Sequence, residues 1–592
     1  MKDTTKKLLS LFNKREKKRL IILFFMMILA AILETVGIGL IVPFVGIVTN
    51  PRVIQKQEAL LYIYELLRFQ TETAFMIFSV VVLLSIFVIK NVYLLFFHYV
   101  QYRVILNQQV KLSRKLFKEY LTKPYIFHLQ RNTADLLRNV NSEVPKVFQG
   151  IILSGFQLFT EVLVILCISL LLIVTAPIAT LTASFLLCGS VFLFFKLFRK
   201  KISHLGEEQQ KVSGTVIKWV NQGLGASKEV KVSGKEKFFV DAYTAQSQIK
   251  ANNSRYLKML DQVPRLFIET LLVSVVLITM LIIIFQGTNT SQLVSTMALF
   301  AMAAFRLMPS INRVVAMITT IRVSQPALNV VYKDLFDDTG KRKNEHNLQD
   351  MPKEINHKDK VFSNSIQLSN VSFRYPGQSD YSIKDVSLTI PIGQSVAFIG
   401  ESGAGKTTIV DIILGLFEPE KGEILIDGKY LNEQKELWQN KIGYIPQSIF
   451  LSDDTIRGNV AFGIHSEQIN DEEVWRALDQ AQLKEFVKGL PNQLNTKVGE
   501  RGVRLSGGQR QRIGIARALY NNPEILFMDE ATSALDNETE KEIMKSIHGL
   551  KGEKTLIIIA HRLSTIENCD QIIKVSNGKV GSIVGCLNQS VI

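Results

Sequence analysis

Gly400-Glu-Ser-Gly-Ala-Gly-Lys406-Thr407 is the stretch that decides the fold of the C-terminal half. It follows an apolar, β-branched run at residues 395–399 and precedes a helical pattern at 408–416, which predicts a strand, a glycine loop and a helix in that order. The N–H groups of such a loop and the positive end of the helix bind phosphate. The residues expected to bind the nucleotide here are Gly400, Ser402, Gly403, Gly405, Lys406, Thr407 and Thr408.

A second apolar run, at residues 525–528, places Asp529 and Glu530 at the C-terminal end of another strand. Asp529 and the Thr407 hydroxyl suit Mg²⁺, and Glu530 is the carboxylate suited by type to polarise an attacking water molecule. Further short β-rich runs, at 424–426 and 555–559, alternate with helical patterns. The C-terminal half is therefore predicted to be an α/β domain that binds and hydrolyses ATP.

The segment Leu505-Ser506-Gly507-Gly508-Gln509 lies just before that strand, and with it the sequence resembles the ATP-binding-cassette (ABC) ATPases. In that family this signature binds the γ-phosphate of an ATP molecule held by the opposite subunit. The resemblance implies that Ser506, Gly507, Gly508 and Gln509 contact nucleotide across a dimer. The expected partner is a second copy of the chain.

Other roles follow from the same resemblance, position by position. Tyr375 is expected to stack on adenine, Gln447 to link Mg²⁺ to the membrane domain, and His561 to contact the γ-phosphate. The implied catalytic set is Glu530, His561 and Gln447, and the implied metal ligands are Thr407, Gln447 and Asp529. The segment Ser533-Ala-Leu-Asp536 matches the loop that joins the two sites, and residues 496–502 resemble the coupling segment of exporters.

Composition points to a membrane protein. The 592 residues are 47% hydrophobic, with a mean hydropathy of +0.18, which is unusual for a soluble chain. Residues 1–350 hold 42 Lys and Arg against 22 Asp and Glu, and these cations flank long apolar runs, so the basic excess indicates membrane topology and not nucleic-acid binding. The four cysteines have neither metal-site nor disulfide-framework spacing.

Six apolar stretches are long enough to cross a bilayer. They are residues 20–48, 74–97, 147–174, 177–198, 263–285 and 293–318. Lys and Arg crowd the N-terminus and the loops 98–146 and 199–262, so the positive-inside rule predicts cytoplasmic termini and a cytoplasmic ATPase domain. The chain is expected to be a multi-pass protein of the bacterial inner (plasma) membrane.

The predicted architecture has three parts. Residues 1–333 form an all-α polytopic membrane domain of exporter type with six transmembrane helices, 334–362 a polar linker, and 363–592 the α/β P-loop ATP-binding-cassette domain. Helical patterns in both cytoplasmic loops predict that the spans continue beyond the membrane and end in short turns. Outside, residues 53–68 form an amphipathic pattern that fits either an interfacial helix or a helix packed on neighbouring spans.

Charged residues within the spans indicate the kind of cargo, because each costs several kcal/mol unless it pairs or faces a cavity. Arg306 and Arg313 are seven residues apart, which stacks them on one face of the last span, and Arg265 begins the fifth span. Guanidinium groups on one face suit a phosphate or pyrophosphate. The alternative is that these arginines pair with Glu269 or Glu34, or end their helices.

The membrane domain also resembles the flippases of lipid-linked oligosaccharides used in bacterial protein glycosylation. The resemblance lies in residues 32–44, residues 125–144, the pairs Phe305-Arg306 and Asn312-Arg313, and the external amphipathic segment. It implies ATP-driven outward movement of a polyprenyl-pyrophosphate glycan. A multidrug, lipid or peptide exporter would carry the same ATPase motifs, and a non-transporting ATPase such as a gated channel or sensor is a further alternative.

Overall fold

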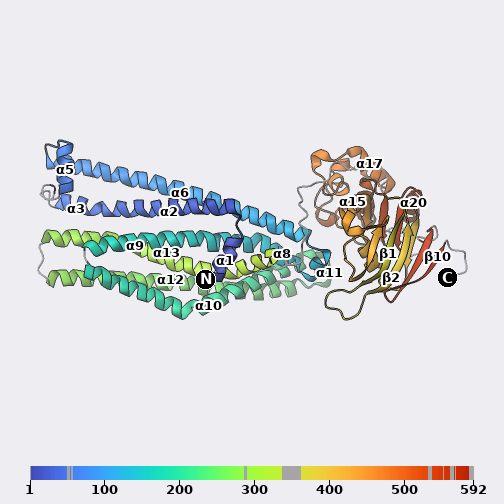
Figure 1. Ribbon diagram of the computed structural model, residues 1–592, viewed down its shortest axis with the longest axis horizontal. Coiled ribbons are helices and arrows are strands. Elements are labelled where there is room, and N and C mark those ends of the chain that lie inside the picture. Colours follow the sequence, from blue (N-terminus) through green and yellow to red (C-terminus); the bar gives the residue numbers. More distant parts are fainter. Residues whose placement is uncertain are drawn as a thin grey trace. The chain divides into compact units, whose positions relative to one another are not determined.

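A computed structural model gives the fold of the chain (Figure 1). The residues that it describes are 2–49, 54, 58–175, 177–285, 290–336, 362–530, 537–550, 552–560, 566 and 569–585. They divide into two compact units: a helical unit of residues 1–123 and 130–345, and a second unit of residues 124–129 and 346–592. Each unit is described separately below.

The helical unit is built from long helices that run side by side (Figure 1). Its helices are α1 (Lys2–Ser10), α2 (Lys14–Gly39), α3 (Ile41–Thr49), α5 (Glu58–Leu66), α6 (Glu72–Thr122), α8 (Thr133–Arg138), α9 (Ser154–Thr175), α10 (Pro177–Gly225), α11 (Ser227–Ser233), α12 (Glu236–Phe285) and α13 (Thr290–Phe336). Two π-helical segments, Asn139–Glu143 and Lys146–Leu153, join α8 to α9. Helix α7 (Tyr125–Gln130) lies mainly in the second unit.

Every predicted span lies within these helices and the second π-helical segment, except for Leu40 between α2 and α3. In the described part of the chain, four segments are long and apolar enough to cross a membrane: Lys14–Gly37, Glu72–Thr122, Thr133–Leu170 and Leu307–Phe336. The exporter-type helical architecture is confirmed, while the number of six crossings stays a prediction. Helix α13 continues to Phe336, so the first residues of the expected linker are still helical.

Several helices are much longer than a bilayer is thick. Helix α6 has 51 residues, which corresponds to roughly 76 Å at 1.5 Å per residue, against about 30 Å for the hydrocarbon core. It contains neither proline nor glycine, the usual causes of sharp kinks. The expectation that the spans extend beyond the membrane as helices is confirmed by α6, α10, α12 and α13.

The first predicted span is divided in two. Helix α2 ends at Gly39, and α3 begins at Ile41. Pro43 has no N–H group to donate to the carbonyl of Gly39, and regular bonding resumes where the Phe44 N–H donates to the Leu40 carbonyl. The proline explains the interruption, because a helix tends to break or bend where this donor is missing.

The predicted amphipathic segment contains the short helix α5. Leu60 and Tyr64 pack against the buried residues Ile47, Ile54 and Phe75. Ile63 and Leu67, which lie three residues after Leu60 and Tyr64, respectively, and so share their helical face, are 38% and 48% exposed. The helix therefore packs on its neighbours through one edge and leaves apolar side chains uncovered in this chain.

Helix α13 is held closely between two other elements at Val323 and Ser324. A Cβ atom on Gly206 of α10 would lie 2.8 Å from the Val323 carbonyl oxygen and 3.0 Å from its Cα. A Cβ atom on Gly150, in the second π-helical segment, would lie 2.8 Å from the Ser324 Cβ. These two glycines allow the backbones to approach more closely than any larger residue would permit.

The second unit contains two sheets. A four-stranded antiparallel sheet has the order β2-β1-β4-β5, and a six-stranded sheet has the order β10-β9-β3-β8-β7-β6. The strands are β1 (Ser365–Phe373), β2 (Ile383–Pro391), β3 (Ser395–Ile399), β4 (Lys421–Ile426), β5 (Lys429–Tyr430), β6 (Ile442–Ile445), β7 (Ile525–Asp529), β8 (Thr555–Ile559), β9 (Gln571–Ser576) and β10 (Lys579–Gly585). All four strand regions expected from the sequence are present.

Helices cover these sheets and complete the α/β unit (Figure 1). They are α14 (Lys406–Ile413), α15 (Lys435–Lys441), α16 (Ile456–Val460), α17 (Asp471–Gln480), α18 (Lys484–Lys488), α19 (Gly507–Tyr520) and α20 (Asn537–His548). Strands β3, β8, β7 and β6 are neighbours and run parallel. Their carboxyl ends therefore lie along one edge of the sheet, where open α/β sheets bind ligands.

Candidate functional site

The predicted nucleotide residues gather at the carboxyl edge of the six-stranded sheet. The glycine loop follows β3, Asp529 ends β7 and Glu530 comes next, while Gln447 stands two residues after β6. Because β3 and β7 both pair with β8 in parallel, the loop and the two carboxylates lie at the same end of adjacent strands. The topology thus brings together residues that are more than 120 positions apart in sequence.

The glycine loop has the conformation that its sequence requires. Gly400, Gly403 and Gly405 have φ values of +150°, +81° and +106°, which side chains with a Cβ rarely adopt. A Cβ atom on Gly400 would also lie 2.2 Å from the Val575 carbonyl oxygen. Glycine is therefore needed here both for backbone conformation and for space.

Lys406 is folded back onto its own loop. Its Nζ donates to the carbonyl oxygens of Gly400, at 2.8 Å, and Glu401, at 2.9 Å, and the residue is only 5% exposed. Thr407 is exposed at the start of α14, whereas Thr408 is buried. The ammonium group therefore already has two acceptors that an arriving phosphate would have to replace.

Glu530 adopts a conformation that is unusual for a residue with a side chain. Its φ is +46°, a left-handed conformation that costs of order 1 kcal/mol or more outside glycine. The backbone is held there by the Glu530 N–H, which donates to the Ile559 carbonyl at 3.3 Å. The Gln447 Nε2 donates to the Glu530 carboxylate at 2.8 Å. Two residues that sequence analysis placed in the catalytic set are therefore in direct contact.

A further carboxylate that the sequence analysis did not single out lies next to Asp529. Asp411 of α14 is mostly buried, and its burial, followed by the charge of Asp529, raises the pKa of its carboxyl group to about 6. Strong pKa shifts tend to occur at functional sites. The signal in the sequence was its spacing, because Asp411 is five residues beyond Lys406 on the same short helix.

Tyr375 lies beside the phosphate-binding helix. Its hydroxyl group is 3.1 Å from the Thr408 hydroxyl, and its ring makes edge-on contacts with Phe373 and Phe417 at centroid distances of 5.1 and 5.6 Å. Burial raises the pKa of its phenol. The tyrosine is thus adjacent to the loop, and adenine stacking stays a prediction.

The signature segment begins helix α19. The Ser506 hydroxyl accepts the Gln509 N–H at 3.2 Å, and the Gln509 side chain accepts the Ser506 N–H at 2.9 Å, which is a reciprocal capping box. Ser506 itself is exposed, and the positive end of the 14-residue helix lies directly behind it. This arrangement suits an anion that approaches from outside the chain.

The donor types of the predicted metal ligands fit Mg²⁺. Thr407 offers an exposed hydroxyl, Asp529 a carboxylate and Gln447 an amide oxygen, and all three are hard oxygen ligands of the kind that this ion prefers. The Gln447 amide nitrogen is turned toward Glu530. His561 and the segment from Ser533 to Asp536 lie outside the described residues.

The three arginines predicted to bind the cargo differ in their contacts and exposure. Arg313 forms a two-point ion pair with Glu161 of α9, with Nε–Oε1 at 2.6 Å and Nη2–Oε2 at 3.1 Å. Arg265 of α12 is exposed. Arg306 lies in α13, but its side chain is outside the described part. Arg313 is therefore paired, as the alternative interpretation allowed, but with an acid that it did not name.

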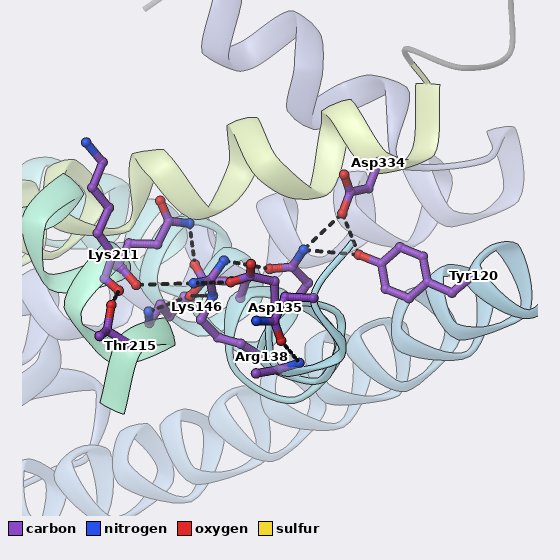
Figure 2. A network of polar contacts seen from close by, with 12 residues as sticks. Tyr120, Asp135, Arg138, Lys146, Lys211, Thr215 and Asp334 are labelled. Carbon is purple, nitrogen blue, oxygen red and sulfur yellow. Dashed lines mark hydrogen bonds and ion pairs between the residues drawn. The ribbon is translucent and has the colours of Figure 1, made fainter. Parts of the chain in front are cut away.

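A buried polar cluster at the end of α13 was missed by the sequence analysis (Figure 2). The Tyr120 hydroxyl, from the end of α6, donates to the Asp334 carboxylate at 2.5 Å, and the Asn139 amide donates to the same oxygen at 2.9 Å. Arg131 lies 3.9 Å from the other oxygen. Asp334 was expected to begin the linker, but it is only 9% exposed and ties α13 to α6.

The same cluster continues around Glu143, which is fully buried in the first π-helical segment. Its carboxylate accepts from the Lys146 Nζ at 2.9 Å and from the Gln210 side chain of α10 at 2.9 Å. Arg138 lies 3.8 Å away and also pairs with Asp135 (Figure 2). A buried charge needs such partners, so the cluster fixes α8, the π-helical segment and α10 to one another.

Residues 124–129, which follow α6, belong to the second unit. The Tyr125 ring lies 5.8 Å from the Phe417 ring, and Ile126 packs against the apolar core that contains Phe373 and Phe417. Lys123 and Gln130, on either side, belong to the helical unit. The chain thus contributes a short insertion from its helical half to the core of the α/β half.

Comparisons with known proteins agree with this arrangement. Residues 19–308 match the family model for the ABC transporter transmembrane region, and residues 383–533 match the family model for the ABC transporter. The chain is 33% identical over 479 residues to an ATP-dependent lipid A-core flippase of Cupriavidus metallidurans, which covers 80% of the chain and 78% of the relative.

A second lipid A-core flippase, from Saccharophagus degradans, is 32% identical over 507 residues, covering 84% of the chain and 82% of that relative. A solved structure of a bacterial Atm1-family ABC exporter with ATP bound has the same fold, with a TM-score of 0.76 and 23% identity over 97% of this chain and 96% of that one. The chain therefore belongs to the ABC transporters, as a half-transporter that couples ATP hydrolysis to transport.

Proposed function

We propose that the chain is an ATP-driven flippase that moves a lipid-linked oligosaccharide, a polyprenyl-pyrophosphate glycan, across the bacterial inner membrane. The observation that supports this substrate class is the geometry of Arg313 in α13, whose Nε and Nη2 donate together to the two oxygens of the Glu161 carboxylate of α9. That donor pair matches two oxygens of a phosphate as well as those of a carboxylate. The lipid A-core flippases among its relatives support movement of a lipid.

The ATPase roles are assigned to the residues at the carboxyl edge of the sheet. Lys406 and the N–H groups of the glycine loop bind the phosphates, and Tyr375 stacks on the adenine. Glu530 orients the attacking water and accepts its proton, with Gln447 and His561 beside the γ-phosphate. When bound, Mg²⁺ would be held by Thr407, Gln447 and Asp529 and would neutralise phosphate charge.

The working unit is a dimer of two copies. Each Ser506–Gln509 segment, which begins with the exposed Ser506, contacts the nucleotide held by the other copy, so neither copy completes a site alone. Closure of the two ATPase units moves residues 124–129, and the long helices transmit this movement to the membrane. Both termini and the ATPase domain lie in the cytoplasm.

A lipid A-core flippase is the second candidate, because the relatives that match most of the chain carry that name. Multidrug and peptide export are less favoured, because a paired arginine within the membrane helices suits an anionic headgroup better than a cationic or apolar cargo. The test below includes each of these cargo classes.

The test is transport by purified protein in liposomes. Fluorescent polyprenyl-pyrophosphate oligosaccharide, lipid A-core, a cationic drug and a peptide are compared for ATP-dependent movement, with Glu530→Gln as the variant that binds but does not hydrolyse ATP. We expect flipping of the pyrophosphate lipid and its loss in the double variant Arg306→Ala, Arg313→Ala, with basal ATP hydrolysis largely kept. Preferential movement of another cargo, or normal flipping by the double variant, would contradict the proposal.

A further inference from the structure

We infer that Glu161 is an internal competitor for the anionic headgroup: its carboxylate binds Arg313 when substrate is absent and must be displaced when phosphate binds. This inference rests on the proposed function, because it requires a phosphate-bearing cargo. It assigns a role in specificity and release to an acidic residue within a predicted span.

The first argument is the geometry of the pair. The Arg313 Nε and Nη2 donate to the two Glu161 oxygens at 2.6 and 3.1 Å, so one edge of the guanidinium is used by a single two-oxygen anion. A phosphate would use the same kind of edge with similar spacing. Two anions cannot both occupy that edge, so occupation by Glu161 and by a headgroup phosphate would exclude each other.

The second argument is the surroundings of the pair. Val164, Ile168, Ile311 and Val315 are all buried near it along α9 and α13, and Glu161 lies near the middle of the predicted span 147–174. A lone carboxylate at such a position would cost several kcal/mol, and pairing with Arg313 compensates it. The pair thus keeps the region close to neutral when no cargo is present.

The third argument is that the two partners are not equally covered. The Arg313 side chain is 39% exposed, whereas that of Glu161 is 12% exposed. Arg313 is also steadied by Ser310, whose buried hydroxyl lies 3.4 Å from Nη2. The guanidinium is therefore the more accessible partner. A headgroup anion can approach it and take over its Nε and Nη2 donors as the carboxylate turns away, while the arginine stays in place.

Exchange of anions would couple cargo to helix packing. The Glu161–Arg313 pair connects α9 with α13, two helices that pack along each other. A phosphate that takes over Arg313 releases this connection, and the return of Glu161 after transport would expel the phosphate. The carboxylate would therefore weaken binding in the resting state and speed product release.

The test measures binding and turnover separately in the full-length protein in nanodiscs and liposomes. The probe is fluorescent polyprenyl-pyrophosphate oligosaccharide, and the variants are Glu161→Gln, Glu161→Asp, Arg313→Gln and the double variant of Glu161→Gln with Arg313→Gln. Glu269→Gln, a second acid in a predicted span whose side chain is exposed, is the matched control. Glutamine preserves the shape of Glu161 while removing its charge.

We expect Glu161→Gln to lower the Kd and KM for the probe about fivefold, since the loss of an ion pair of roughly 1 kcal/mol favours the competing anion, and to lower kcat as release slows. Glu161→Asp should restore the wild-type values at least in part, Glu269→Gln should leave them unchanged, and in the Arg313→Gln background Glu161→Gln should have no further effect.

The outcomes separate the two proposals. If the wild-type protein binds and flips the probe, but Glu161→Gln leaves Kd unchanged or raises it, Glu161 is only a structural partner and the inference is wrong while the function stands. If the wild-type protein neither binds nor flips the probe, the proposed function fails, and the inference fails with it.

Discussion

Replacing Gly206 by alanine tests whether the close contact between α10 and α13 holds the helical unit together. The new methyl carbon would lie 2.8 Å from the Val323 carbonyl oxygen and 3.0 Å from the Val323 Cα. Both are backbone atoms, which cannot turn aside as a side chain can. The two helices must therefore separate locally by several tenths of an ångström.

The expected cost combines two opposing effects. Overpacking of this kind costs about 1–3 kcal/mol, and alanine in place of glycine in a helix returns about 1 kcal/mol. Relative to the wild-type protein, the net loss should therefore be at most about 2 kcal/mol. For a helical unit of this size, a loss of about 2 kcal/mol corresponds to a melting temperature lower by roughly 3 °C.

Gly189 provides a matched control, because it lies in the same helix and a Cβ atom there would meet nothing within 4 Å. Thermal unfolding of Gly206→Ala, Gly189→Ala and the wild-type protein in nanodiscs, with ATP hydrolysis measured in parallel, makes the comparison. Gly189→Ala should melt at or slightly above the wild-type temperature. A Gly206→Ala protein that melts as high as Gly189→Ala would refute the reasoning.

Two further predictions concern the α/β unit. Tyr125→Ala removes a ring that lies 5.8 Å from the Phe417 ring and so weakens the packing of residues 124–129, which we propose move with the ATPase unit. Flipping should therefore fall about threefold or more, while ATP hydrolysis is largely kept. Tyr125→Phe keeps the ring and is the control, and equal losses of flipping in both variants would argue against a packing role. Asp411, whose pKa is raised to about 6 by burial and by Asp529, destabilises the folded state above pH 6, and this cost disappears as the pH falls toward 4. Between pH 7.5 and 5 the nucleotide-free wild-type protein should therefore gain about 1 kcal/mol of stability relative to Asp411→Asn, after allowance for solvent screening. Denaturant titrations at both pH values measure this difference, and equal changes in the two proteins would contradict the prediction.

The sequence predicted the ATPase core well because its signals are local. The strand, loop and helix around Lys406 are consecutive, and Asp529 and Glu530 follow directly from an apolar strand. The glycine loop and the two carboxylates then lie close together, because the carboxyl ends of parallel strands meet at one edge of the sheet. The left-handed conformation of Glu530 was not predictable, because it depends on the Ile559 carbonyl from another strand.

The polar contacts of the helical unit were not predictable, because their partners are distant in sequence. Arg313 was expected to bind a phosphate or to pair with Glu269 or Glu34, and 152 residues separate it from its actual partner, Glu161. Asp334 was predicted to begin a polar linker. Its burial could not be predicted, because it depends on contacts with Tyr120 and Asn139, which are distant in sequence. Helical periodicity identifies which residues share a face, but it does not identify which helices meet.

The uninterrupted length of α6 has a mechanical consequence. A rod of roughly 76 Å that pivots about one end by about 5° moves its far end by about 7 Å, which is more than the pitch of one helical turn. Since α6 has no proline or glycine to absorb bending, little of such a swing would be lost along the way. A modest rearrangement near Tyr120 would therefore become a larger displacement at the opposite end of the helix, near Glu72.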